Sequence, residues 1–265
     1  YTQYSTNNKI PYNVNMFINL NIVSTRYILE YLITNEIWDG LLGRRNYGPI
    51  KNWIIHVEDL TGLFKNKSSF NKDISGWDVS QVKNMKSMFD MVDTTGSTSF
   101  NQPLNNWDVG NVIDMSYMFR SCGKNQNDAS KCFNQPLNNW DVSNVTNMEG
   151  MFYRTWNFSQ SLNNWNVSKV TNMKRMFSRT SSFNGDLSNW NVSNVTDMSY
   201  MFYFSSFNRN INTKTIDRNG QTYQAWNVSK VTNMEGMFQA TFKFNQSLNK
   251  WDISKVTNMK SMFSD

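Results

Sequence analysis

The chain has 265 residues, of which 39% are apolar and 15% aromatic, enough to form a sizeable hydrophobic core. Its net charge of +6 comes from 26 basic and 20 acidic side chains that are spread along the length, which argues against a charged arm of the kind that binds nucleic acid. No apolar run reaches the roughly 18 residues that a membrane-spanning helix needs, because polar residues interrupt even the stretch Met16 to Ile33.

Residues 1–49 differ from the rest of the chain and are expected to form a helical cap. Ser24 can cap a helix whose apolar face holds Tyr27, Ile28, Tyr31 and Leu32. A second apolar stripe follows at Trp38, Leu41 and Leu42. We expect this N-terminal segment to cover the first unit of a repeat domain over residues 50–265.

The rest of the chain repeats one phrase, of which "WDVSNVTNMEGMF" at Trp140 to Phe152 is a clear copy. A second phrase, such as "FNQPLNN" at Phe133, precedes most copies. The base period is 25 residues, and insertions lengthen three copies near residues 90–99, 121–132 and 208–225. The copies begin at Trp53, Trp77, Trp107, Trp140, Trp165, Trp190, Trp226 and Trp251.

Each copy predicts a short strand and then a short helical turn. In Trp-Asx-Val the apolar residues alternate with a polar one, which is the period of a half-buried strand. Met148, Met151 and Phe152 fall at i, i+3 and i+4, on one face of a helical turn. Thr146 and Glu149 have the spacing of a capping box at its start.

A unit of 25 residues is too small to bury its own apolar face, so the copies are expected to stack. The expected fold is a repeat solenoid of about eight coils, α/β and similar to leucine-rich repeats, with the strands in a parallel sheet along one side. Its core would hold the eight tryptophans together with Met151 and Phe152. Because the chain stops at "MKSMFSD", in mid-repeat, we expect further chain or a partner to cover the last coil.

An Asp or Asn follows seven of the tryptophans, and stacking would arrange these residues in a column. A row of carboxylates at strand spacing repels itself unless amides dilute it or cations bridge it. Asx turns with amide ladders are the favoured interpretation, and a calcium-binding column is the alternative. The column consists of Asp78, Asp108, Asp141, Asn166, Asn191, Asn227 and Asp252.

Cys122 and Cys132 stand at the two ends of the insertion "SCGKNQNDASKC". A disulfide between them would close a loop of about eleven residues and add roughly 3 kcal/mol at most in the chain-entropy model. A pair of free thiols and a metal site are the alternatives. A disulfide would imply an oxidising location.

The repeat phrase holds almost no catalytic residue types. His56 is the only histidine, which excludes a Ser-His-Asp arrangement built elsewhere and a multi-histidine metal site. No phosphate-binding Gly-Lys-Ser loop and no Rossmann glycine pattern occurs. The copy with Asn194 separates Lys169 from Lys230 and Lys255, so nucleic acid is not an expected partner. We expect no enzyme, no catalytic or metal-ligating residue and no cofactor.

The unit "FNQPLNNWDVSNVTNMEGMF" at Phe133 to Phe152 closely resembles the BspA-like surface-protein repeat, a mycoplasma-type relative of leucine-rich repeats that also occurs in large DNA viruses. The likeness covers about residues 47–265, and "YGPIKNW" at Tyr47 is similar to the lead-in of many members. The chain departs from the family in its three insertions and its two cysteines. The resemblance implies a surface-exposed or host-contacting protein and brings no catalytic residues with it.

We therefore expect a non-enzymatic scaffold at a cell surface or outside the cell, which mediates protein–protein or host-surface contact as an adhesin does. Its partner would be a protein or glycan on a host or neighbouring surface, contacted by the insertions and the exposed polar columns. The alternative is a structural component of a large DNA virus particle, a minor capsid or cement protein in the virion, whose partners would be neighbouring capsid subunits.

Overall fold

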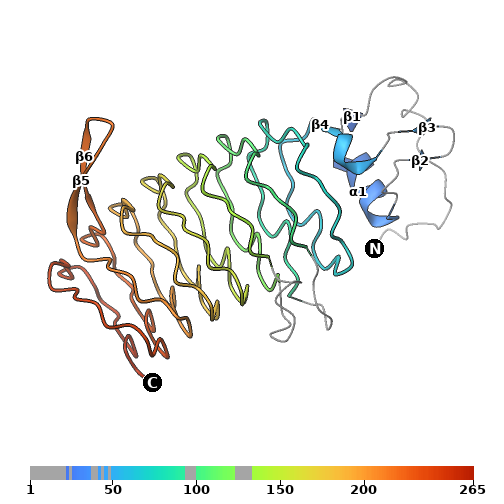
Figure 1. Cartoon of the computed structure of the whole chain (residues 1–265). Helices are drawn as coiled ribbons and strands as arrows, with labels where there is room; N and C mark the ends of the chain where they lie inside the picture. Colours follow the sequence, from blue (N-terminus) through green and yellow to red (C-terminus); the bar gives the residue numbers. More distant parts are fainter. Residues whose placement is uncertain are drawn as a thin grey trace, which may run out of the picture.

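The computed structural model describes residues 22–23, 26–36, 41–42, 45–46, 49–92, 100–122 and 133–265. From residue 50 onward the chain winds through coils that lie side by side, and the N-terminal elements lie at the first of them (Figure 1). Each coil is numbered by its tryptophan in chain order, so coil 1 contains Trp53, coil 4 contains Trp140 and coil 8 contains Trp251. No helix of the described residues is long and apolar enough to cross a membrane.

Short strands pair at two places in the described part of the chain. At the N-terminal end β1 (Ile22–Val23) pairs in parallel with β4 (Ile54–Ile55), just after the 3-10 turn η2 (Ile50–Asn52). Beside them β2 (Leu41–Leu42) pairs antiparallel with β3 (Arg45–Asn46). The third pair is an antiparallel hairpin near the other end, made of β5 (Lys214–Arg218) and β6 (Gln221–Ala225).

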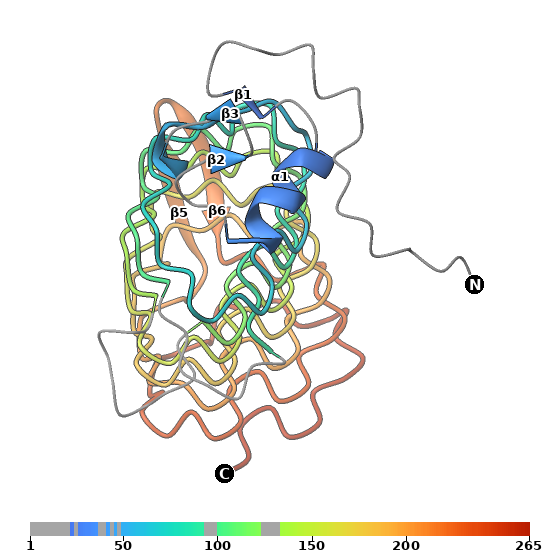
Figure 2. The same cartoon turned by 90° about the vertical axis from the view of Figure 1, so that its right-hand side faces the viewer.

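The helix α1 (Arg26–Thr34) lies across the end of the stack (Figure 2). The side chains that it buries are aliphatic. Its buried residues are Leu29, Leu32 and Ile33, whereas Tyr27 is exposed and Ile28 is only partly buried. The predicted face around Tyr27 is therefore wrong. The spacing i, i+3, i+4 fits both sets, but only the aliphatic set carries no hydroxyl that needs a hydrogen-bond partner when buried. Ser24 and Trp38 lie outside the described residues.

A column of parallel bridges joins each coil to the next at the Asx residue before the first Met of each copy. Beside this column, every second amide donates to the next coil: Met148 N–H to Asn172 O at 3.0 Å, and Gly150 N–H to Lys174 O at 2.8 Å. The coils are thus connected by a narrow ladder of the parallel-sheet type. The bridge residues are Asp59, Asn84, Asp114, Asn147, Asn172, Asp197, Asn233 and Asn258.

The strand and the helical turn predicted within each copy are not where the sequence places them. The strand is predicted at Trp-Asx-Val, but in coil 4 the bridge falls at Asn147. The predicted helical turn is a run of tight turns, in which Met151 N–H donates to Met148 O at 3.2 Å. Because the alternate amides donate to the next coil, they are not available for bonds to the residue four positions back. The Thr146 hydroxyl donates to Ile113 O of coil 3 at 3.4 Å and caps no helix.

The core consists of columns of like side chains. The rings of Trp140 and Trp165 stack with centroids 6.3 Å apart and an interplanar angle of 2°. Phe152 stacks on Phe177 at 5.6 Å in a second column. Seven of the eight repeat tryptophans are buried, as are Met151 and Phe152, and Trp251 in the last coil is half-buried.

A hydrogen bond across the coils satisfies the polar atom of each stacked indole. The Trp140 Nε1–H donates to Leu104 O at 2.8 Å, and Trp165 Nε1–H donates to Leu137 O at 2.8 Å. The same bond recurs from coil 2 to coil 8. A buried indole N–H needs an acceptor, so this bond sets the register in which one coil lies on another.

The third insertion is shorter than the sequence suggests. It is expected at residues 208–225, but Phe207 stacks on Phe183 at 6.0 Å, and Ile211 O accepts the Trp251 indole N–H at 2.9 Å. Residues 207–212 therefore form part of a regular coil, and the hairpin alone is added. Residues 93–99 and 123–132, which make up most of the other two insertions, lie outside the described residues.

Candidate functional site

The β5–β6 hairpin stands out from the stack of otherwise similar coils (Figure 1). Its turn is Asn219-Gly220, and both residues have positive φ, 55° and 76°. Two left-handed residues form the type of two-residue turn that matches the twist of paired strands, and Asn-Gly is its most favourable sequence. The signal that indicates this hairpin in the sequence is therefore Asn-Gly between two stretches rich in Thr, Ile and Tyr.

Side chains of the hairpin fix it to the two preceding coils. Arg218 donates from Nη2 to Asn164 O of coil 5 at 2.6 Å. The Tyr223 hydroxyl donates to Asn189 O of coil 6 at 2.5 Å. Burial raises the pKa of the Tyr223 hydroxyl, so it stays protonated and remains a donor. An insertion in coil 7 thus spans coils 5 to 7.

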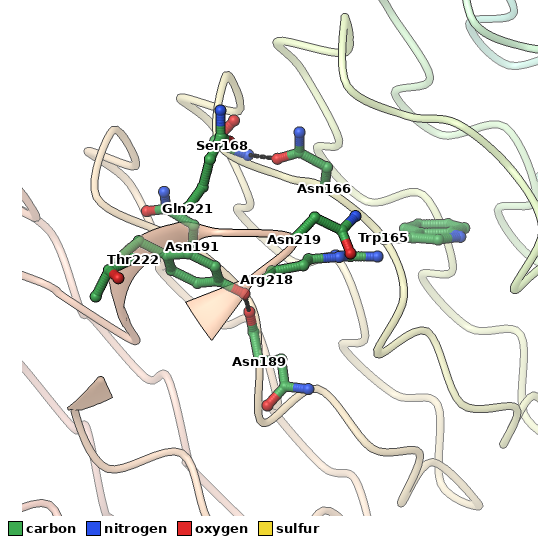
Figure 3. A pocket seen from close by; sticks show the side chains of 10 residues that line it. Trp165, Asn166, Ser168, Asn189, Asn191, Arg218, Asn219, Gln221 and Thr222 are labelled. Atoms are coloured by element: carbon green, nitrogen blue, oxygen red, sulfur yellow. Dashed lines mark hydrogen bonds between the residues drawn. The ribbon is translucent and has the colours of Figure 1, made fainter. Parts of the chain in front are cut away.

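A cleft of about 760 Å³ lies between the hairpin and coils 5 and 6 (Figure 3). Arg218 and Asn219 reach from the hairpin towards the coil that carries Trp165. A second hollow of about 740 Å³ adjoins it over coils 4 and 5, and Asn166, Arg218 and Asn219 line both. We call the two together the hairpin groove.

The lining of the larger cleft is rich in amides and hydroxyls. The hydroxyl residues are Ser168, Thr222 and Tyr223. Arg218 is the one charged residue of this lining, and no carboxylate belongs to it. The amide residues are Asn166, Asn189, Asn191, Asn219 and Gln221.

Two of these amides are held in place by their own backbone. Asn166 Oδ1 accepts from Ser168 N–H at 3.2 Å, and Asn191 Oδ1 accepts from Ser193 N–H at 3.2 Å. Within the described residues, neither Nδ2 group has a hydrogen-bond acceptor. Each amide is therefore oriented by one atom and keeps its donor for a ligand.

The Asx column forms turns of one kind along the whole stack. In every copy from coil 2 to coil 8, the Oδ1 atom accepts the backbone N–H two residues further on. These are Asx turns, the favoured interpretation of the column. Hydrogen bonds from Ser80 and Ser254 lower the pKa values of Asp78 and Asp252. In the described part of the chain, no group of three or more His, Cys, Asp or Glu side chains could hold a metal ion.

The remaining residues singled out in the sequence lie apart from the hairpin groove. Cys122 is buried, with its Sγ atom 3.6 Å from Phe100 O, but Cys132 lies outside the described residues, so the disulfide stays a prediction. Lys169 donates to Asn144 Oδ1 of the preceding coil at 2.7 Å, and Lys230 makes the same bond to Asn194. His56 and Lys255 are exposed.

A second polar surface lies over the tight turns that follow the first Met of each copy. The Tyr117 hydroxyl donates to Glu149 of the next coil. Tyr200 donates in the same way to Glu235, at 2.6 Å, and Arg175 lies over the Tyr200 ring, 5.4 Å from its centroid. The two residues between the repeat methionines are Lys-Ser, Ser-Tyr, Glu-Gly, Lys-Arg, Ser-Tyr, Glu-Gly and Lys-Ser in coils 2 to 8. The residues at these two surface positions therefore repeat every three coils, whereas the core residues repeat in every coil. The repeat phrase does not by itself predict this longer period.

One protein family matches the chain, and its matches cover the repeat coils. The family described as "Mycoplasma protein of unknown function, DUF285" matches residues 41–132, 124–221 and 218–265. No curated protein and no solved structure matches the sequence.

Proposed function

Because the chain belongs to the Mycoplasma-type repeat family DUF285, whose matches run from residue 41 to residue 265, we propose that it is a non-enzymatic repeat scaffold that binds a protein or glycan on another surface. Membership confirms the coarser expectation of a mycoplasma-type repeat protein. The finer expectations, adhesion and an address outside the cell, are part of the proposal. The similarity of the repeat phrase to BspA-like surface repeats supports them.

The observation that carries the proposal is the hairpin groove. On the coil surface outside the groove, Lys169 and Lys230 each bond to an amide of the preceding coil. In the groove, amides oriented by backbone bonds keep free donors next to the exposed guanidinium of Arg218. Rigidly held donors are suited to binding because little side-chain entropy is lost when a ligand arrives.

The composition of the groove favours binding over catalysis. Amides and hydroxyls line the larger cleft, and neither His, Cys, Asp nor Glu is among its lining residues. Those are the groups that most often act as general base or nucleophile. We therefore include the absence of enzymatic activity in the proposal.

The test is binding of the full chain to intact cells. The variant lacks Lys214–Ala225 and joins Thr213 to Trp226, which restores the Phe-to-Trp spacing seen at Phe244 and Trp251. Fluorescently labelled wild-type protein should bind a panel of animal cells, and the hairpin-deleted protein should bind at least about tenfold more weakly. Thermal melts and circular dichroism would verify that the variant is folded.

Two results would contradict the proposal. One is equal cell binding by the folded variant, which would place the contact away from the hairpin groove. The other is no binding by wild type to any cell of the panel. Stoichiometric copies of the chain in purified virus particles would support the alternative of a virion structural component.

A further inference from the structure

The polar groups of the hairpin groove match one class of ligand more closely than others. Asn166 and Asn191 offer Nδ2 donors. The hydroxyls of Ser168 and Thr222 can both donate and accept on one atom. The Tyr223 hydroxyl already donates to a backbone carbonyl and can only accept from a ligand. A sugar presents the complementary arrangement, with several hydroxyls at fixed positions on a rigid ring. The volume of the larger cleft, about 760 Å³, is in the range of small-molecule binding sites.

Arg218 adds a charge requirement to this match. Its Nη2 atom is engaged with Asn164 O, and the side chain is exposed between the two hollows of the groove. A guanidinium presents several N–H groups in one plane, which suits a carboxylate. Asp141, which lines the second hollow, uses Oδ1 to accept Ser143 N–H at 3.0 Å.

A protein segment fits this groove less well. Protein interfaces are centred on aromatic or aliphatic anchors that fill apolar pockets. Here Trp165 and Tyr223 are the aromatic residues of the larger lining, Trp165 is 1% exposed, and the Tyr223 hydroxyl is bonded to Asn189 O. The polar groups of the larger cleft are amides, hydroxyls and one guanidinium, and the second hollow adds the exposed carboxylate of Asp141.

We propose that the hairpin groove binds a saccharide that carries a carboxylate, with Arg218 on the acid and the amides of Asn166 and Asn191 on ring hydroxyls. This inference rests on the proposed function and names the ligand class for the same site.

The experiment titrates the full chain with sialyllactose and, as a matched neutral sugar, lactose, by isothermal calorimetry or NMR. Acetate and an oligoglutamate peptide are the controls for a bare carboxylate and for an acidic protein segment. Sialyllactose should bind and the other three should bind at least about tenfold more weakly, because hydrogen bonds to a charged group are the strong ones.

Arg218→Gln should weaken sialyllactose binding by about tenfold or more. Arg209→Gln is the matched control, because Arg209 is also exposed and donates to a backbone carbonyl, Asn184 O at 2.9 Å, but lines neither hollow. Asn191→Ala should weaken the same binding without removing charge. Melting curves of the three variants check that each is folded.

Equal binding of lactose or acetate, preference for the peptide, or no effect of Arg218→Gln would overturn the inference. So would a lack of saccharide binding by wild type. If wild type binds cells through the hairpin but sialyllactose does not compete, the ligand class is wrong and the proposed function stands. If wild type binds neither cells nor sugar, both fail.

Discussion

Arg26 supplies to coil 1 the hydrogen bonds that every later coil receives from the coil before it. In coil 3 the carbonyls of Asp114 and Ser116 accept amides of coil 2. The equivalent carbonyls of coil 1 are those of Asp59 and Thr61, and Arg26 donates to them at 2.8 and 2.6 Å. One side chain thus replaces two amides of a neighbouring coil.

Arg26→Gln should lower the free energy of unfolding by about 1–3 kcal/mol, because two backbone acceptors lose charged donors. The Arg26–Glu30 ion pair, i to i+4 on α1, adds little to this. Urea denaturation measures the difference, and Arg209→Gln serves again as the control. Equal stability of the two variants would show that Arg26 does not close the stack.

Two Asx turns of the column, at Asp78 and Asp252, and a further Asx turn at Asp73 before it make the stability sensitive to acid. Hydrogen bonds from the serine two residues on lower the pKa values of Asp73, Asp78 and Asp252 below the ordinary 3.8. A carboxyl whose folded pKa is depressed stabilises the fold above the ordinary value. This contribution is lost as the pH falls through the lower, folded value.

Replacing the three with Asn should remove this contribution, so the variant is less stable than wild type at neutral pH and its stability falls less steeply between neutral pH and about pH 3. Asn166 makes the same turn to Ser168 in coil 5, so the backbone tolerates the amide. Thermal melts across this pH range measure the slope. An unchanged slope in the variant would rule out these residues as its source.

At this scale the sequence predicts more of the core than of the groove. A tryptophan at a fixed period identifies the ring that stacks and the Asx turn that follows it. Arg218 and Tyr223 cannot be identified in that way, because they lie in an insertion and the other copies have no equivalent residues. Their roles depend on the carbonyls of Asn164 and Asn189, which neighbour them only in space.

Among the elements, the tight turns contain a contact between neighbouring coils that constrains the residues of both coils. Gly150 has a φ of 56°, and a Cβ there would lie 2.5 Å from the Tyr117 ring of the preceding coil. Tyr117 therefore packs over a glycine and reaches Glu149 beside it. The order Ser-Tyr then Glu-Gly occurs twice along the stack, and it follows from this contact.

Gly62 provides a matched comparison, because its φ is 62° but a Cβ would meet nothing nearer than Lys65 Cβ at 3.7 Å. Both Gly62→Ala and Gly150→Ala should lose about 1–2 kcal/mol for a left-handed alanine. Gly150→Ala should lose a further 1–3 kcal/mol or so to overpacking against Tyr117.

In a Tyr117→Ala background this additional loss should disappear. Chemical denaturation of the four variants and the wild type completes the cycle. Equal losses at Gly62 and Gly150 in the wild-type background would contradict the packing argument.

The sequence pattern fails at this scale for a physical reason. Residues at i, i+3 and i+4 share one face of a helix, but Met148, Met151 and Phe152 also reach one side of two successive tight turns. The two structures differ in the acceptors of the backbone amides, and every second acceptor is in the next coil. Asn219-Gly220, by contrast, predicts its turn from two residues.

Over the whole molecule, the tryptophan rings of successive coils stay nearly parallel. Five pairs of successive tryptophans have centroids 6.2–6.5 Å apart, with planes within 13°. Strands joined by backbone hydrogen bonds lie about 4.8 Å apart. Two of these pairs are parallel within 2°, so the larger distance between ring centroids fits rings that are offset sideways from one coil to the next.

The hairpin should also make one part of the stack more stable than the rest. Without Lys214–Ala225, backbone amides of coils 5 to 7 should exchange with solvent hydrogen about tenfold faster or more, because two tethers are lost. Coils 2 and 3 should be unchanged, since each coil of a repeat array contacts only its neighbours. Hydrogen exchange read by mass spectrometry resolves the two regions, and faster exchange throughout would contradict the local effect.

The bonds of Arg218 and Tyr223 also predict the order in which the coils would separate if the two ends of the chain were pulled apart. Coils held only by their neighbours would unfold one at a time. Each would release a similar length of chain and give one of a series of evenly spaced force peaks. Arg218 and Tyr223 join the hairpin of coil 7 to coils 5 and 6 by hydrogen bonds, so coils 5 to 7 would be the last to separate.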